Sequence, residues 1–252
     1  MAEAPQLGFG DKLSLFVQRF VGWIAFPVWG SICFLLMRFL GRYRIEHIQQ
    51  LRQEYQRLVK AHPGPIILCS NHLTKIDSGL ITWSLGSIWT YMHSFRLFSW
   101  NLPERERYFG NIFLRLICYF GSCIPVDRGG DRSAVNHSLD KIRYLMNKNH
   151  VITLFPEGKR SVRGKVDTKN YSYGVGKLLE SVQNCKVICV YLRGSGQEKR
   201  SSVPRIGDTF YVKLRPIQIA SQYQGIRAAR DYSKQIIHAL HQMEEEYFAL
   251  CR

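Results

Sequence analysis

Between Arg19 and Arg38 the chain has eighteen consecutive residues without a charged side chain, Phe20 to Met37. An apolar segment of this length is at the threshold for a helix that crosses a bilayer. Pro27 lies in its middle, and proline removes a backbone hydrogen bond and bends or breaks a helix. Basic residues lie on both sides, as is usual at a membrane interface. We predict a bent or two-helix apolar element in or on the bilayer, with a buried helix pair of a soluble core and a full span as the alternatives.

The chain also carries a large excess of positive charge. Lys and Arg number 35 against 19 Asp and Glu, which gives a formal net charge of +16. Such a charge favours anionic partners: phosphates, a membrane surface or nucleic acid. No nucleic-acid-binding motif is present, and the aromatic residues gather in the apolar N-terminal part rather than among the basic residues. We therefore expect membrane lipids and phosphate-bearing substrates as partners, and no nucleic acid.

Cysteine usage bears on the compartment. The seven cysteines are an odd number, and no two of them form a C-x-x-C pair. Most lie in apolar runs, so we predict reduced core residues in a reducing compartment and a membrane-associated protein on the cytoplasmic face. No His and Cys residues have the spacing of zinc ligands, and no metal site is predicted.

The rest of the chain alternates short apolar runs with amphipathic stretches. The predicted strands are 65–71, 88–92, 123–126, 151–155, 187–192 and 210–214. The predicted helices are 45–59, 77–85, 105–120, 131–148, 174–181 and 228–248. This alternation predicts an α/β fold, with a mixed, largely parallel sheet flanked by helices. We expect residues 1–60 to form the membrane anchor and an amphipathic helix, and residues 61–252 to form a catalytic domain.

A histidine and an aspartate follow the first predicted strand, in the sequence Ser70-Asn-His-Leu-Thr-Lys-Ile-Asp-Ser78. In one continuous helix His72 and Asp77 would point about 140° apart and would not meet. With His72 in the loop and Asp77 in the first helical turn, the carboxylate can reach the imidazole. It would then fix the tautomer, and the other ring nitrogen could take a proton. The pattern predicts the base and orienting carboxylate of a catalytic triad, without its nucleophile.

Two other predicted strands end in charged turns. The segment Phe155-Pro-Glu-Gly-Lys-Arg-Ser161 makes a sharp turn in which Gly158 can take a positive φ, and Arg160 offers a planar fork suited to phosphate. A third strand is followed by Arg128. Ligands of open α/β sheets bind outside the carboxyl ends of the strands, so we expect these turns to lie around one site.

Together these segments resemble the motifs of the glycerolipid acyltransferases, the 1-acyl-sn-glycerol-3-phosphate acyltransferase (lysophospholipid acyltransferase) family. That family carries an N-H-x4-D block, a Gly…Asp-Arg block and an F-P-E-G-x-R-S block in this order. The matching residues are Asn71, His72 and Asp77; Gly121, Asp127 and Arg128; and Phe155 to Gly158 with Arg160 and Ser161. The resemblance covers roughly residues 60–215, and the apolar N-terminus is similar to the family's membrane-binding helices. Lys159 stands where the family usually has Thr, and Cys189 where its fourth block usually has Pro, which bears on the acceptor.

The resemblance implies that His72 deprotonates an acceptor hydroxyl and that Asp77 orients it. The hydroxyl would attack the thioester of acyl-CoA or of acyl carrier protein, which is already activated, so no cofactor is expected. The residues implied to bind the substrate are Arg128, Glu157, Gly158, Arg160 and Ser161.

The predicted function is acyl transfer to a lysophospholipid, with 1-acylglycerol-3-phosphate as the first choice of acceptor and phosphatidic acid as the product. Other acceptors stay open: glycerol-3-phosphate, another lysophospholipid or a lyso-ornithine lipid. A non-catalytic membrane protein that binds anionic lipids is the alternative from a different class.

Overall fold

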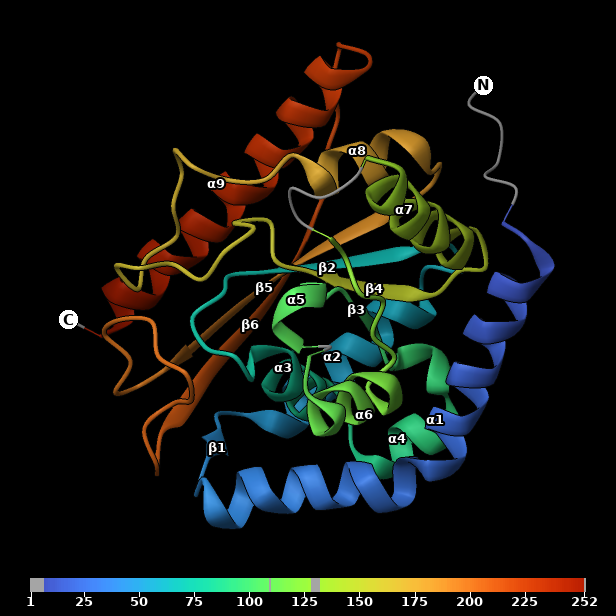
Figure 1. Ribbon diagram of the computed structural model, residues 1–252. Helices are drawn as coiled ribbons and strands as arrows, with labels where there is room; N and C mark the ends of the chain where they lie inside the picture. The colour runs from blue at the N-terminus through green and yellow to red at the C-terminus, as the bar shows by residue number, and fades with distance from the viewer. Residues whose placement is uncertain (1–6, 109, 128–131, 252) are drawn as a thin grey trace.

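The computed structural model describes residues 7–108, 110–127 and 132–251. Within these residues six strands form one sheet in the order β1-β6-β5-β2-β4-β3 (Figure 1). The strands are β1 (Arg44–Ile45), β2 (Ile66–Ser70), β3 (Trp100–Asn101), β4 (Val151–Leu154), β5 (Lys186–Gly194) and β6 (Thr209–Ile217). Neighbouring strands are parallel except β5 and β6, which are antiparallel. The predicted mixed, largely parallel sheet is confirmed.

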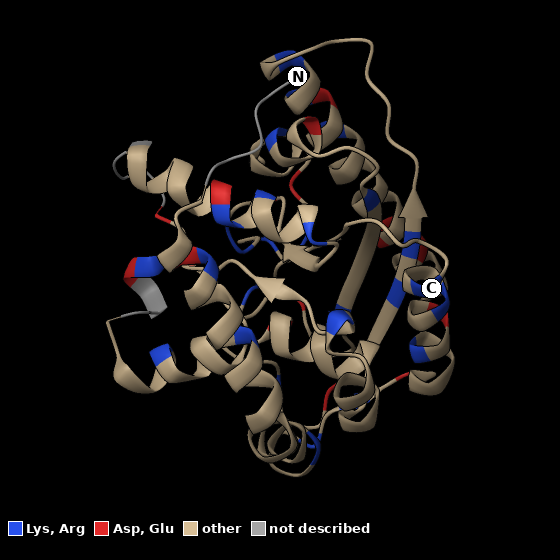
Figure 2. Cartoon of the chain, turned by 90° about the vertical axis from the view of Figure 1, so that its right-hand side faces the viewer, with Lys and Arg blue, Asp and Glu red and all other residues tan. Residues whose placement is uncertain are grey.

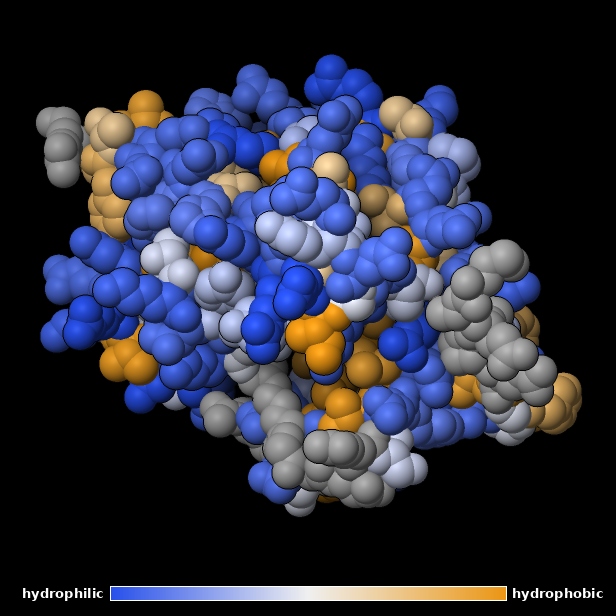
Figure 3. All heavy atoms as spheres, turned by 90° about the horizontal axis from the view of Figure 1, so that it is seen from above, coloured by the Kyte–Doolittle hydropathy of each residue, from blue (hydrophilic) through white to orange (hydrophobic). Residues whose placement is uncertain are grey.

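Helices cover both faces of the sheet, which explains why its central strands are mainly apolar and almost completely buried. Successive side chains of a strand point to opposite faces. In β2, Ile67 and Cys69 pack with α7 (Arg132–Asn147), α8 (Gly174–Ser181) and α9 (Ile226–Leu250). Ile66 and Leu68 pack on the other face, with α2 (Ile48–Lys60) and α3 (Asp77–Leu85). Seen from above, on the side of α8, the surface is mainly hydrophilic (Figure 3).

The N-terminal apolar segment is one helix, α1 (Phe9–Leu35), which continues as the π-helical turn η1 (Leu36–Leu40). Pro27 lies inside the helix, and α1 changes direction along its course, running down one side of the domain and then beneath it (Figure 1). Proline is the usual cause of such a bend, because its ring leaves the preceding turn without a backbone donor. The Trp29 indole donates a hydrogen bond to the carbonyl of Gly22 in that turn.

One stripe of α1 packs on the domain and the rest is exposed. The buried positions recur at helical spacing: Leu15, Gln18, Gly22, Phe26 and Gly30. Most of the other apolar side chains face outward, and residues Phe9–Leu40 are long and apolar enough to cross a membrane. This is a weak indication of membrane association, in line with the predicted bent element. Arg19 points inward instead of flanking the segment, and its guanidinium donates to Ser122 Oγ (3.0 Å) and to the Phe98 carbonyl (2.7 Å).

Three predicted elements differ in the structure. Residues 88–92 form the helix α4 (Ile88–His93) instead of a strand, because the Ser87 hydroxyl accepts from the Thr90 N–H (3.1 Å) and caps a helix there. The predicted helix 105–120 is two helices, α5 (Arg105–Tyr108) and α6 (Ile112–Phe120), since Asn111 caps the start of the second. Residues 123–126 make single bridges to 101 and 104 rather than a strand. The short strands β1 and β3 and the 3-10 turn η2 (Phe95–Leu97) were not predicted. The division of the chain after residue 60 stays a prediction.

The register of the central strands brings three loops to one edge. Cys69 of β2 lies beside Leu154 of β4, and Ser70 lies beside Val190 of β5. Because these three strands are parallel, the segments that follow them leave the sheet on the same side. The loop after β2, with His72, and the turn after β4, with Glu157, are therefore neighbours.

Candidate active site

His72 and Asp77 meet at the carboxyl end of β2. His72 lies in the loop after the strand, and Asp77 is the first residue of α3. His72 Nδ1 is 2.9 Å from Asp77 Oδ2, and the two side chains are 19% and 2% exposed. A carboxylate can only accept, so Nδ1 is the nitrogen that carries the hydrogen when the imidazole is neutral, and the lone pair is then on Nε2. The structure thus brings together the predicted pair in the predicted geometry.

The Asp77 carboxylate is held by the loop that it closes. Oδ2 also accepts from the backbone N–H groups of Leu73 (2.6 Å) and Thr74 (2.8 Å). Oδ1 accepts from the hydroxyl of Thr74 (2.5 Å). Four donors therefore fix the position of the carboxylate, and the imidazole is oriented by a group that cannot rotate away.

The turn after β4 contacts both the ring and the backbone of His72. The Phe155 ring stacks on the imidazole with the two ring centroids 4.2 Å apart. The backbone N–H of His72 donates to Glu157 Oε1 (3.0 Å), and the N–H of Ser161 donates to the His72 carbonyl (3.0 Å). The two loops thus hold each other through contacts on both sides of the histidine.

Glu157 is buried at this junction. It is 4% exposed, and burial raises the pKa of its carboxyl to about 8, partly offset by the hydrogen bond from the His72 N–H. A carboxyl group with this pKa is mostly protonated near neutral pH. It faces the His72 loop in this structure, so its predicted contact with substrate stays a prediction.

The other residues of this turn have different environments. Gly158 has a φ of +71°, which favours glycine. The Ser161 hydroxyl bonds to the backbone N–H and carbonyl of Lys165. Arg160 donates from Nη1 to the carbonyl of Ser201 (2.9 Å). Arg128 lies outside the described residues. The structure therefore brings Glu157 and Ser161 to His72 and ties Arg160 to a neighbouring loop.

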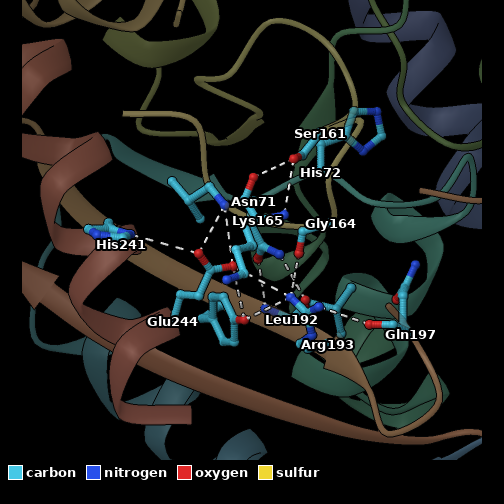
Figure 4. A network of polar contacts seen from close by, with 12 residues as sticks. Asn71, His72, Ser161, Gly164, Lys165, Leu192, Arg193, Gln197, His241 and Glu244 are labelled. Atoms are coloured by element: carbon cyan, nitrogen blue, oxygen red, sulfur yellow. Dashed lines mark hydrogen bonds and ion pairs between the residues drawn. The ribbon is translucent and has the colours of Figure 1, made fainter. Parts of the chain in front are cut away.

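A buried polar network lies behind these loops (Figure 4). Asn71 accepts from the Leu192 N–H and donates to its carbonyl, both at 2.9 Å, which joins the end of β2 to β5. Arg193 donates to the carbonyls of Gly164 (2.6 Å) and Gln197 (2.9 Å) and pairs with Glu244 of α9 (3.5 Å). Thr74, Arg193 and Glu244 were not predicted from the sequence as residues of the site. The one sequence feature that could have pointed to them is that each is a polar residue in or beside an apolar run.

Potential metal ligands do not gather here. In the ranges 7–108, 110–127 and 132–251, no group of three or more His, Cys, Asp or Glu side chains could hold a metal ion.

Comparison with known proteins agrees with the motifs. No curated protein matches the chain. The family model described as Acyltransferase matches residues 42–193, which is more than half of the chain and includes the loops of His72 and Glu157. The chain therefore belongs to the glycerolipid acyltransferase family.

Proposed function

We propose that the protein transfers a fatty acyl group from acyl-CoA or acyl carrier protein to the hydroxyl of a lysophospholipid, with 1-acylglycerol-3-phosphate as acceptor and phosphatidic acid as product. The observation that carries the proposal is the His72–Asp77 contact of 2.9 Å, with the histidine side chain still partly exposed. Membership of the acyltransferase family supports the reaction class.

In the proposed reaction, His72 Nε2 takes the proton from the acceptor hydroxyl as its oxygen attacks the thioester carbonyl. The Asp77 carboxylate stabilises the imidazolium that forms. The tetrahedral intermediate then collapses, the C–S bond breaks, and the imidazolium returns the proton to the leaving thiolate. The hydroxyl becomes an ester and the carrier is released as a thiol, so no net proton is consumed.

Direct transfer is favoured over a covalent acyl-enzyme. The sequence has no G-x-S-x-G segment. Cys69, the cysteine nearest to His72 along the chain, is completely buried, and burial raises its pKa well above the ordinary value. A nucleophilic thiol needs the opposite shift.

Basic residues would bind the acceptor phosphate. Arg160 follows β4 close to the His72 loop, and a guanidinium can hold two phosphate oxygens at once. Arg128 is proposed for the same role from the motif alone. The exposed apolar side of α1 would keep the enzyme at the bilayer, where the acceptor lipid resides.

The proposal is tested with an acceptor panel. The purified full-length protein is incubated with radiolabelled acyl-CoA or acyl carrier protein and each of four acceptors: lysophosphatidic acid, glycerol-3-phosphate, lysophosphatidylcholine and a lyso-ornithine lipid. We expect labelled phosphatidic acid with lysophosphatidic acid and little product with the others. If labelled product forms with only one of the other acceptors, that compound is the acceptor instead. No thioester consumption by the folded, membrane-bound protein would favour the non-catalytic lipid-binding alternative.

A further inference from the structure

The loop of residues 195–208, between β5 and β6, lies against the candidate site. The N–H of Ser201 donates to the Leu73 carbonyl (3.2 Å), and the N–H of Lys75 donates to the Ser202 carbonyl (3.0 Å). Both partners belong to the loop that carries His72 and leads to Asp77 at the start of α3. Arg160 donates to the Ser201 carbonyl from the other side (2.9 Å). The first part of the 195–208 loop is thus fixed to both segments of the site.

The second part of the same loop is fixed to the end of the apolar helix. The N–H of Gly207 donates to the carbonyl of Gly41, directly after η1 (2.8 Å). The buried Tyr43 hydroxyl donates to the carbonyl of Pro204 (3.1 Å). In Figure 1 this orange loop lies at the lower left, near β1 and the end of the blue helix. One loop therefore links the site to the membrane-anchor segment.

The loop and the helix end that it contacts both expose apolar side chains. Val203 is 57% and Ile206 is 68% exposed. Leu36, Phe39 and Leu40 of η1 are also more than half exposed. Leaving large apolar side chains in water is unfavourable, so their exposure on two segments that contact each other indicates a binding surface.

The same two segments carry exposed cations. Lys199, Arg200 and Arg205 of the loop are exposed, as are Arg38 and Arg42 at the end of the helix. Across the described ranges, none of the five forms an ion pair with a carboxylate. Figure 2 shows the wider excess of Lys and Arg over Asp and Glu. Segments that expose both apolar side chains and cations without a carboxylate partner match the interface of an anionic bilayer, in which phosphates lie above the acyl chains.

We infer that the 195–208 loop is a second bilayer-docking element: Val203 and Ile206 enter the interface, while Lys199, Arg200 and Arg205 bind anionic lipid headgroups. Its contacts to Leu73 and Lys75 then hold the His72 loop at the membrane surface. The inference rests on the proposed function in taking a lipid as the substrate. Its test does not measure acyl transfer, so either idea can fail without the other.

Hydrogen exchange of the full-length protein locates the contact. The protein is measured alone, with neutral phosphatidylcholine vesicles, and with vesicles that also contain phosphatidylglycerol. We expect exchange in peptides from 195–208 to slow at least about fivefold on the anionic vesicles, the effect of a single cation at such a surface. Peptides from 218–225, which connect β6 to α9, serve as the control and should not change.

Two loop variants and their matched controls test the residues. Val203→Ser with Ile206→Ser should weaken vesicle partition about tenfold, whereas Ile226→Ser, at a position on α9 that is 64% exposed, should not. Lys199→Gln with Arg200→Gln and Arg205→Gln should weaken binding to anionic vesicles more than tenfold and binding to neutral vesicles little. The control with the same loss of charge is Arg227→Gln with Arg230→Gln and Lys234→Gln on α9. All changed side chains are at the surface, so folding is verified by thermal melting.

Three results would overturn the inference. The first is unchanged exchange in 195–208 while peptides of α1 are protected by vesicles. The second is equal partition of the loop variants and their α9 controls. The third is protection that grows with protein concentration in the absence of vesicles, which would assign the surface to a second copy of the chain.

Discussion

Replacing Asp77 by Asn removes one charge and leaves the shape of the site almost unchanged. The amide oxygen can take the place of Oδ2 and still accept from His72 Nδ1 and from the N–H groups of Leu73 and Thr74. The amide NH2 then faces the Thr74 hydroxyl, which can rotate to accept. The variant therefore isolates the effect of the carboxylate charge on an imidazolium formed at His72.

The size of the effect follows from the geometry. With Nδ1 and Oδ2 2.9 Å apart, the centres of the two charges are about 4 Å apart. At an effective dielectric constant of about 20, the lost attraction is about 4 kcal/mol. We expect kcat for acyl transfer to fall about a thousandfold, because each factor of ten corresponds to about 1.4 kcal/mol.

The assay follows labelled acyl transfer with donor and acceptor both saturating, so that kcat is measured. Asp140→Asn is the matched control: it makes the same chemical change on α7, where the carboxylate pairs with Arg143. The variant and the control should melt within a few degrees of the wild type. If Asp77→Asn kept turnover within about threefold of the control, stabilisation of an imidazolium at His72 would not be part of the reaction.

Three other predictions concern the neighbouring groups and the anchor. The pKa of about 8 for Glu157 lies above its ordinary 4.5, so the folded protein holds a proton that the unfolded chain has released, and stability falls as pH rises between these values. Glu157→Gln keeps an acceptor for the His72 N–H but cannot titrate. Its melting temperature relative to that of the wild type should therefore rise as the pH increases from about 5 to about 8, and a pH-independent difference would contradict the raised pKa of Glu157. Arg160→Lys keeps the charge but loses the bidentate fork, so the acceptor KM should rise while the donor KM stays nearly unchanged. A rise in the donor KM alone would show that Arg160 does not bind the acceptor phosphate. Ile24→Glu with Val28→Glu places charges on the exposed side of α1 and should reduce liposome flotation more than about tenfold, whereas undiminished flotation would place the anchor elsewhere.

Local pattern was sufficient to predict much of the fold. The helix predicted at 174–181 is α8, the apolar runs at 65–71 and 151–155 contain β2 and β4, and the run at 187–192 lies within β5. The prediction from local pattern was wrong at 88–92, where β-branched and aromatic residues favour a strand. The Ser87 cap and the packing of Tyr91 with Phe26 and Phe98 favour a helix there instead. Tertiary packing overrides a propensity of this size.

The candidate site divides in the same way. The contact of His72 with Asp77 is local, because five residues and one loop determine it, and sequence analysis predicted it. The stacking of Phe155 on His72, the bond from its backbone to Glu157 and the Asn71–Leu192 pair join segments about 85 to 120 residues apart. They depend on which strands are neighbours and in which register, and no spacing within one segment encodes that.

Acyl transfer by His72→Ala shows whether His72 Nε2 takes the proton of the acceptor hydroxyl. The variant is compared with His93→Ala, an exposed histidine on α4, after both have been shown to fold and to bind liposomes. A general base contributes about 10²–10⁴-fold, so turnover by His72→Ala should fall at least a hundredfold while His93→Ala stays near the wild type. Turnover by His72→Ala close to that of His93→Ala would contradict the assigned chemistry.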